Sequence, residues 1–115
     1  MQGGQPAGAL DDITVLDLGQ VIGMPFCTML LADMGARVIK VESRAMGAER
    51  MSLGIRRERD GKTERVHAAQ YRERNKLGIT LDLKQPAGVT LFRELTAKAD
   101  VVADVPRPKS CKSTC

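Results

Sequence analysis

Aromatic residues are scarce in this sequence, and tryptophan is absent. Phenylalanine, tyrosine and tryptophan make up 3% of the 115 residues, so a core must be built mainly from leucine, isoleucine, valine, methionine and alanine. The apolar fraction of 43% is ordinary for one small globular domain. Scarce aromatics disfavour a nucleic-acid partner, because single-strand binders interleave aromatic rings with basic residues.

Long apolar runs are also missing. No stretch approaches the roughly 20 residues that a membrane-spanning helix needs. The first twelve residues, MQGGQPAGALDD, lack the basic-then-apolar order of a signal peptide. We therefore predict a cytoplasmic protein with no membrane partner and a flexible N-terminus over residues 1–12.

Cysteine and histidine are too few to indicate a disulfide framework or a metal centre. Cys27 lies among apolar neighbours and is predicted to be a small buried side chain. Cys111 and Cys115 supply only half of the four ligands of a structural zinc site. His67, the single histidine, has no cysteine or serine arrangement nearby, so we interpret it as a surface residue. The prediction is that no metal is bound.

Positive charge exceeds negative charge, with a formal net charge of +4. This excess indicates an anionic partner, either nucleic acid or a phosphate-bearing cofactor, or nothing in particular. Basic residues concentrate between Arg50 and Lys76, where acidic residues interrupt them. Mixed signs are typical of a solvated segment, which favours no nucleic-acid partner.

Strand-like and helix-like segments alternate along the chain. Short apolar, β-branched runs predict strands, and runs that begin at a proline predict helices. Strands are expected at 13–18, 37–42, 78–83 and 99–105, and helices at about 25–34, closed by Gly35, and from Pro86 onward. The long excursion over 43–75 has no clean period, and we expect only a short helix near 67–74.

This order predicts an α/β fold, a Rossmann-like parallel sheet with flanking helices over residues 13–105, followed by a disordered tail over 106–115. Ligands of such sheets bind beyond the carboxyl ends of the strands. Glu42 ends its strand roughly where a Rossmann domain places an acid for a ribose hydroxyl. However, GQVIGMP is not the glycine fingerprint, and no P-loop occurs. The residues alone therefore indicate a small α/β domain with possible affinity for a phosphate ligand.

Two blocks of sequence carry a resemblance. ITVLDLGQVIGMPFCTMLLADMGARVIKVES and NKLGITLDLKQPAGVTLFRELTAKADVV are similar to the opening of the family III CoA-transferases, which include formyl-CoA and carnitine CoA-transferases and 2-methylacyl-CoA racemases. The resemblance implies a partial domain of a longer chain and an interlinked homodimer. It implies acyl transfer between a CoA thioester and a carboxylic acid, through an anhydride on an aspartate. It implies no permanently bound cofactor.

The resemblance also implies positions that contact CoA. Its motifs place two residues at the head of the first helix, a cation after the second strand and an L-D-L-K stretch: Ile22, Gly23, Arg44, Leu81, Asp82, Leu83 and Lys84. Strand core is a reading of Leu81 to Leu83 that is compatible with such contacts, and a solvated lysine at a helix start is an equal alternative for Lys84. Met24 and Leu77 depart from the family's glycine and arginine, and Arg44 stands one position after the arginine that the family has following this strand.

The end of the sequence departs most from the family. PRPKSCKSTC shares only an Arg-Pro pair with the family and is otherwise unrelated polar sequence. Such an abrupt change is typical of a truncated reading frame. None of the family's catalytic residues lies in this segment, so we expect the chain alone to be inactive. A racemase fragment and a catalytically inactive CoA- or nucleotide-binding domain remain the alternatives, because LDLKQPAG does not separate these branches.

Overall fold

The protein was analysed as a computed structural model that describes residues 8–20, 22–44, 55–66 and 70–104. The elements, in chain order, are β1 (Thr14–Asp17), α1 (Gly23–Asp33), β2 (Arg37–Glu42), β3 (Ile55–Arg59), β4 (Lys62–Val66), a 3-10 helix η1 (Gln70–Glu73), β5 (Lys76–Thr80), α3 (Pro86–Thr96) and β6 (Val101–Ala103). None of the helices in these ranges is long and apolar enough to cross a membrane.

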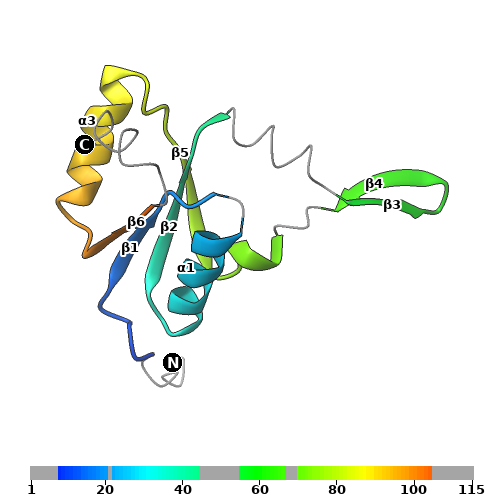
Figure 1. Cartoon of the computed structure of the whole chain (residues 1–115), viewed down its shortest axis with the longest axis horizontal. Coiled ribbons are helices and arrows are strands. Elements are labelled where there is room, and N and C mark those ends of the chain that lie inside the picture. Colours follow the sequence, from blue (N-terminus) through cyan, green and yellow to red (C-terminus); the bar gives the residue numbers. More distant parts are fainter. Residues whose placement is uncertain (1–7, 21, 45–54, 67–69, 105–115) are drawn as a thin grey trace, which may run out of the picture.

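Four strands form one parallel sheet in the order β5-β2-β1-β6. Counted along the chain, the strands of this sheet therefore lie in the order 3-2-1-4, as in the first four strands of a doubly wound sheet. The side on which successive strands are added changes at β1, because β2 and β5 lie on one side of it and β6 forms the edge on the other side (Figure 1). The predicted α/β fold with a parallel sheet and flanking helices is confirmed.

The core consists of two layers, one on each face of the sheet. Val15 and Val38 pack with Ala32 of α1 on one face, while Leu16 and Val41 pack with Phe92 of α3 on the other. Successive residues of a strand point to opposite faces, so adjacent residues of β1 join different layers. The two helices consequently cover opposite faces of the sheet.

The helix boundaries follow local signals. Pro86 begins α3 as predicted, because its missing N–H would be unpaired in a first turn. Gly35, with φ at 103°, follows the end of α1 and takes the left-handed conformation that glycine tolerates. The first helix begins at Gly23, two residues before the predicted start.

The prediction that Cys27 is buried is wrong, because this residue is exposed on α1. The helix instead buries Pro25, Thr28, Met29 and Ala32. Its outer side carries an apolar row spaced four residues apart, in which Ile22, Phe26, Leu30 and Met34 are between 44% and 59% exposed. Because α1 is apolar on nearly all sides, its sequence does not indicate which side faces the sheet.

Two predicted strands differ from the observed ones in their limits. β5 covers Lys76–Thr80 instead of 78–83, and it pairs with β2 in parallel register from Val38 opposite Lys76. Leu81 still donates its N–H to the carbonyl of Glu42, 2.8 Å away, before the chain turns. β6 is restricted to Val101–Ala103 within the predicted 99–105. Apolar residues therefore extend beyond the ladder in both cases.

The excursion between β2 and β5 contains regular structure that we did not predict. β3 and β4 form an antiparallel hairpin, which stands away from the main sheet in Figure 1. Asp60 and Gly61 form its turn with φ at 52° and 71°, the combination of a type I′ turn. The Asp-Gly pair was the available signal. η1 lies within the short helix expected near 67–74, of which residues 67–69 are outside the described ranges.

The predicted flexible N-terminus and disordered tail lie mostly outside the described ranges. Of the former, Gly8 to Asp12 form a turn beside the end of α1. There the Leu10 N–H donates to the Met34 carbonyl at 3.0 Å.

Candidate functional site

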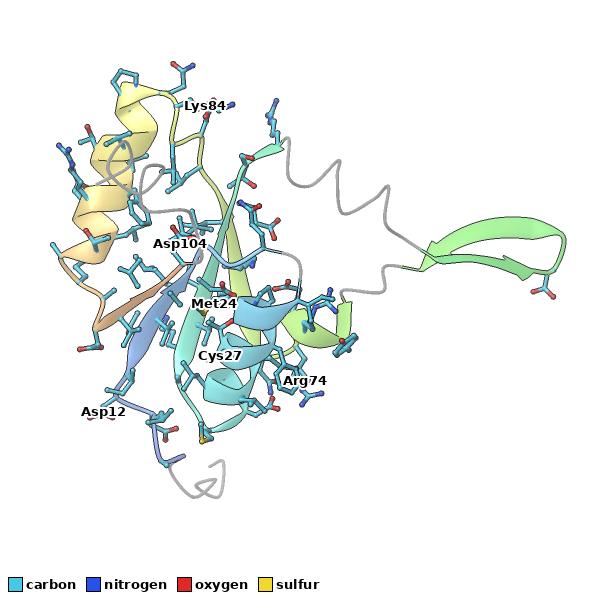
Figure 2. All side chains as sticks on the ribbon, in the orientation of Figure 1. Asp12, Met24, Cys27, Arg74, Lys84 and Asp104 are labelled. Carbon is cyan, nitrogen blue, oxygen red and sulfur yellow. The ribbon has the colours of Figure 1, made fainter. Side chains whose placement is uncertain are left out.

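The residues predicted to contact a ligand follow the carboxyl ends of three parallel strands. Ile22 and Gly23 come after β1, Arg44 after β2, and the Leu81–Lys84 segment after β5. Parallel strands end at the same edge of a sheet, so all of these residues belong to the edge where doubly wound folds bind ligands. Figure 2 shows Lys84 at the top of the view, Asp104 beyond the end of β6, and Met24 well below Lys84 at the head of α1.

The head of α1 presents main-chain N–H groups without a side-chain cap. Ile22 occupies the N-cap position, where its hydrocarbon side chain cannot accept a hydrogen bond, and the first turn contains no acidic residue. The partial positive charge of the helix N-terminus is therefore not offset locally. Gly23 is exposed, and a Cβ added there would meet no atom within 4 Å beyond its chain neighbours.

Met24, where the resemblance leads one to expect glycine, packs inward. Its side chain is partly buried against the core layer under α1. A Cβ added to Gly19 would lie 2.6 Å from the Met24 Cβ, so the methionine rests directly on that glycine. Gly19 thus makes room for the side chain that this chain carries at the head of α1.

The Leu81–Lys84 segment combines core packing with an exposed turn. Leu81 and Leu83 pack into the layer under α3, so the strand-core interpretation of these leucines holds for their packing. Between them, Asp82 accepts a hydrogen bond from the Lys84 N–H at 3.0 Å through its carboxylate. Lys84 itself is exposed. The segment therefore exposes the Lys84 cation at a turn that the packing of Leu81 and Leu83 holds in place.

A buried polar cluster, which the sequence analysis missed, lies beneath the loop between β1 and α1. Asp17 is fully buried and accepts hydrogen bonds from the Thr28 hydroxyl at 2.6 Å and the Gly19 N–H at 2.7 Å. The Lys76 ammonium lies 2.9 Å from one carboxylate oxygen, and the Lys40 ammonium lies 3.5 Å from the other. We call these four side chains, Asp17, Thr28, Lys40 and Lys76, the Asp17 cluster.

The same two lysines bind the main chain of the loop. Lys40 donates a short hydrogen bond to the Gly19 carbonyl, and Lys76 donates to the Pro25 carbonyl at 2.9 Å. Both ammonium groups are almost completely buried. Each therefore has a carboxylate and a carbonyl as partners, which is the condition for burying a charge without a large penalty.

A sequence signal for this cluster was present. Asp17 and Lys40 are the charged residues within the otherwise apolar cores of their strands, VLDL and VIKV, and the parallel register places them opposite each other. Charged residues are almost never buried unless they are paired, so a charge in each of two such strands indicates a pair. Lys76 gave no comparable signal, because it starts its strand after a charged segment.

Burial alone would raise the pKa of Asp17, but its partners outweigh this effect. The hydrogen bonds from Thr28 and Lys76, the charge of Lys40 and the Gly19 N–H together hold the pKa of this carboxyl below its ordinary value. The group is therefore ionised at neutral pH and, with the Glu73 carboxylate 3.5 Å from the Lys76 ammonium, can balance the two buried ammonium groups.

Acid should weaken the fold through this carboxyl. The pKa of Asp17 is lower in the folded chain than in the unfolded chain, so its stabilising contribution is complete above the ordinary pKa of about 3.9 and is lost as the pH falls below it. We expect the free energy of unfolding, measured by urea titration, to fall more steeply below that pH in the wild type than in Asp17→Asn. Equal slopes in the two proteins would contradict this assignment.

A second ion pair lies at the opposite end of α1. Arg74 donates to both carboxylate oxygens of Asp33, and Asn75 donates to the same carboxylate at 2.9 Å. The hydrogen bond from Arg74 is the main cause that lowers the pKa of Asp33. Figure 2 shows Arg74 at the other end of the helix from Met24. The chain around the start of β5 is thus bound to both ends of α1, through Arg74 and Asn75 at Asp33 and through Lys76 at Pro25.

Other chemistry is not evident in the described ranges. Within them no three His, Cys, Asp or Glu side chains gather as metal ligands. Glu42 is partly buried at the end of β2, at the predicted edge. His67, Cys111 and Cys115 lie outside the described residues.

Comparisons with known proteins agree with this arrangement. The family model described as CoA-transferase family III matches residues 10–114. This chain belongs to CoA-transferase family III.

Curated relatives include a succinyl-CoA–D-citramalate CoA-transferase of Chloroflexus aurantiacus, 39% identical over 94% of this chain and 26% of the relative. A succinyl-CoA:mesaconate CoA-transferase of Haloarcula hispanica is 40% identical over 84% of this chain and 24% of the relative. The chain thus spans about a quarter of the length of these relatives.

Solved structures show the same fold. The Mycobacterium tuberculosis protein Rv3272 superposes with a TM-score of 0.80 at 32% identity, covering 96% of this chain and 30% of that protein. A CAIB/BAIF family protein from Brucella suis gives a TM-score of 0.76 at 28% identity, covering 95% of this chain and 29% of that protein.

Proposed function

We propose that this chain is the CoA-binding N-terminal part of an acyl-CoA:carboxylate CoA-transferase. The observation that carries the proposal is the carboxyl edge of the sheet, where the uncapped head of α1 follows β1 and the exposed Lys84 follows β5, the two strands on either side of β2 in a family III fold. The relatives cited above are named as CoA-transferases, which favours this branch over the racemases.

Each candidate residue has a role that suits a CoA thioester. Ile22 and Gly23 bring the main chain of the first helical turn near the ligand, where N–H groups and the helix dipole favour phosphate. Arg44 and Lys84 are exposed cations that would pair with phosphate groups. Asp82 fixes the turn that presents Lys84, and Leu81 and Leu83 anchor this turn in the core.

The reaction itself requires residues outside this chain. In the proposed whole enzyme, an aspartate carboxylate attacks the acyl-CoA carbonyl and CoA thiolate leaves, which forms an acyl-aspartyl anhydride. The thiolate then attacks the aspartyl carbonyl of the anhydride, so that an aspartyl-CoA thioester forms and the donor acid leaves. The acceptor carboxylate attacks this thioester, and the same steps in reverse order yield the acceptor's CoA thioester and the free aspartate. We propose that the domain of residues 13–105 supplies CoA binding, within an interlinked cytoplasmic homodimer.

Titration calorimetry with CoA tests the binding role. We expect the 115-residue chain to bind CoA, and Lys84→Gln to weaken binding by about threefold to tenfold, because one exposed phosphate contact contributes about 1 kcal/mol. Lys98→Gln is the matched control, since Lys98 is an exposed lysine after the opposite end of α3. Absence of binding at millimolar CoA, or equal losses in the two variants, would contradict the proposal.

A further inference from the structure

The Asp17 cluster touches both ends of the loop that the proposed function assigns to CoA. Gly19, at the start of the loop, donates its N–H to Asp17 at 2.7 Å and accepts a hydrogen bond from Lys40 through its carbonyl. Pro25, in the first turn of α1, accepts from Lys76 at 2.9 Å. The main chain that carries Ile22 and Gly23 lies between these two fixed points.

The cluster gathers strands that are distant along the chain. Lys40 comes from β2 and Lys76 from the first residue of β5, and both meet the Asp17 carboxylate at the end of β1. Three of the four strands of the parallel sheet therefore contribute to holding one loop. A cluster that served only to neutralise Asp17 would not need to bind a loop carbonyl with each ammonium group.

We infer that Lys40 and Lys76 are positioning residues, which hold the Gly19–Pro25 loop so that the head of α1 meets the CoA thioester with its main-chain N–H groups. This inference rests on the proposed function. The two lysines act through the loop and are buried beneath it, so neither touches the ligand. Their contribution is preorganisation, because a loop held in its bound conformation loses less entropy when the ligand binds.

The test compares cations at the two ends of α1. Lys76→Met removes the donor to Pro25, and Arg74→Gln removes the cation that pairs with Asp33 at the far end. With both proteins folded, we expect Lys76→Met to weaken CoA binding in calorimetry by about tenfold or more. Arg74→Gln should bind CoA as the wild type does, and Lys76→Arg, which keeps the cation, should recover part of the affinity.

A local measurement makes the inference independent of CoA. Amide hydrogen exchange of Gly19 and Phe26 reports on the loop and the first helical turn, while the Met34 amide reports on the end of α1. In Lys76→Met we expect exchange at Gly19 and Phe26 to accelerate by about tenfold more than at Met34. Thr28→Val keeps both cations and removes one donor to Asp17, so it provides a milder variant with a smaller effect in the same direction.

The outcomes separate the two proposals. Wild-type chain that fails to bind CoA would overturn the proposed function, while the exchange rates would still decide whether the lysines hold the loop. Equal acceleration at Gly19 and Met34 would overturn the positioning role. Wild-type CoA affinity in folded Lys76→Met would also overturn it, even with the binding function intact.

Discussion

Replacing Asp17 with alanine is expected to lower the free energy of unfolding by about 3–5 kcal/mol, the usual cost of breaking a buried ion pair by removing one partner. The almost completely buried Lys40 would lose its carboxylate partner, and the equally buried Lys76 would keep only Glu73, 3.5 Å away, as a carboxylate partner. The Thr28 hydroxyl and the Gly19 N–H would lose their acceptor as well. Such a loss is a large fraction of the total stability of a small domain.

Urea denaturation of Asp17→Ala and Asp33→Ala measures this effect against a matched change. Asp33 is also an aspartate with cationic and amide partners, but its ion pair with Arg74 is exposed. Exposed pairs contribute little because water screens them, so we expect a much smaller loss for Asp33→Ala. Similar losses in the two variants would show that the Asp17 cluster is not the stabilising centre that its burial indicates.

Replacing Gly88 with alanine should be the second most damaging change. A Cβ at this position would lie 2.1 Å from the main-chain oxygen of Asp82, far inside van der Waals contact. Alanine normally stabilises a helix interior relative to glycine by about 1 kcal/mol. Here we expect a net loss of about 1–3 kcal/mol, because α3 must move away from the Leu81–Lys84 segment.

Gly23→Ala provides the control in the first turn of the other helix, where an added Cβ meets no atom within 4 Å beyond its chain neighbours. Thermal unfolding should show a lower midpoint for Gly88→Ala and an unchanged or slightly higher midpoint for Gly23→Ala. An unchanged midpoint in Gly88→Ala would contradict this prediction, because it would show that the turn at Asp82 can move aside at little cost in free energy. The contact also gives a physical reason for the glycine that ends the segment LDLKQPAG.

The parts of the fold that sequence reasoning predicted have local causes. Pro86 and Gly35 mark helix ends through conformational preferences of single residues, and β2 was predicted within its observed limits. The hairpin at Asp60 and Gly61 also has a local cause, and its omission was an error of interpretation. Strand limits at β5 were wrong because apolar residues continue past the last ladder pair, into the core layer under α3.

The candidate site divides in the same way. The family resemblance supplied the candidate residues, and in the observed topology they follow the carboxyl ends of β1, β2 and β5, while their contacts with CoA remain predictions. Which side of α1 faces the sheet was not predictable. Cys27 was predicted to be buried for that reason, because an apolar residue on a helix with apolar residues on nearly all sides can face either the sheet or the solvent.

By itself, the sequence determined the alternation of strands and helices, the start of α3 at a proline, the end of α1 at a glycine, and the family resemblance, because each depends on neighbouring residues. Only the tertiary structure decided that Lys76 meets Asp17, 59 residues away, beneath the loop at the head of α1. That meeting depends on the register of β5 against β2 and on which face of the sheet α1 covers. Both are set by packing between segments distant in the chain, which local preferences do not encode.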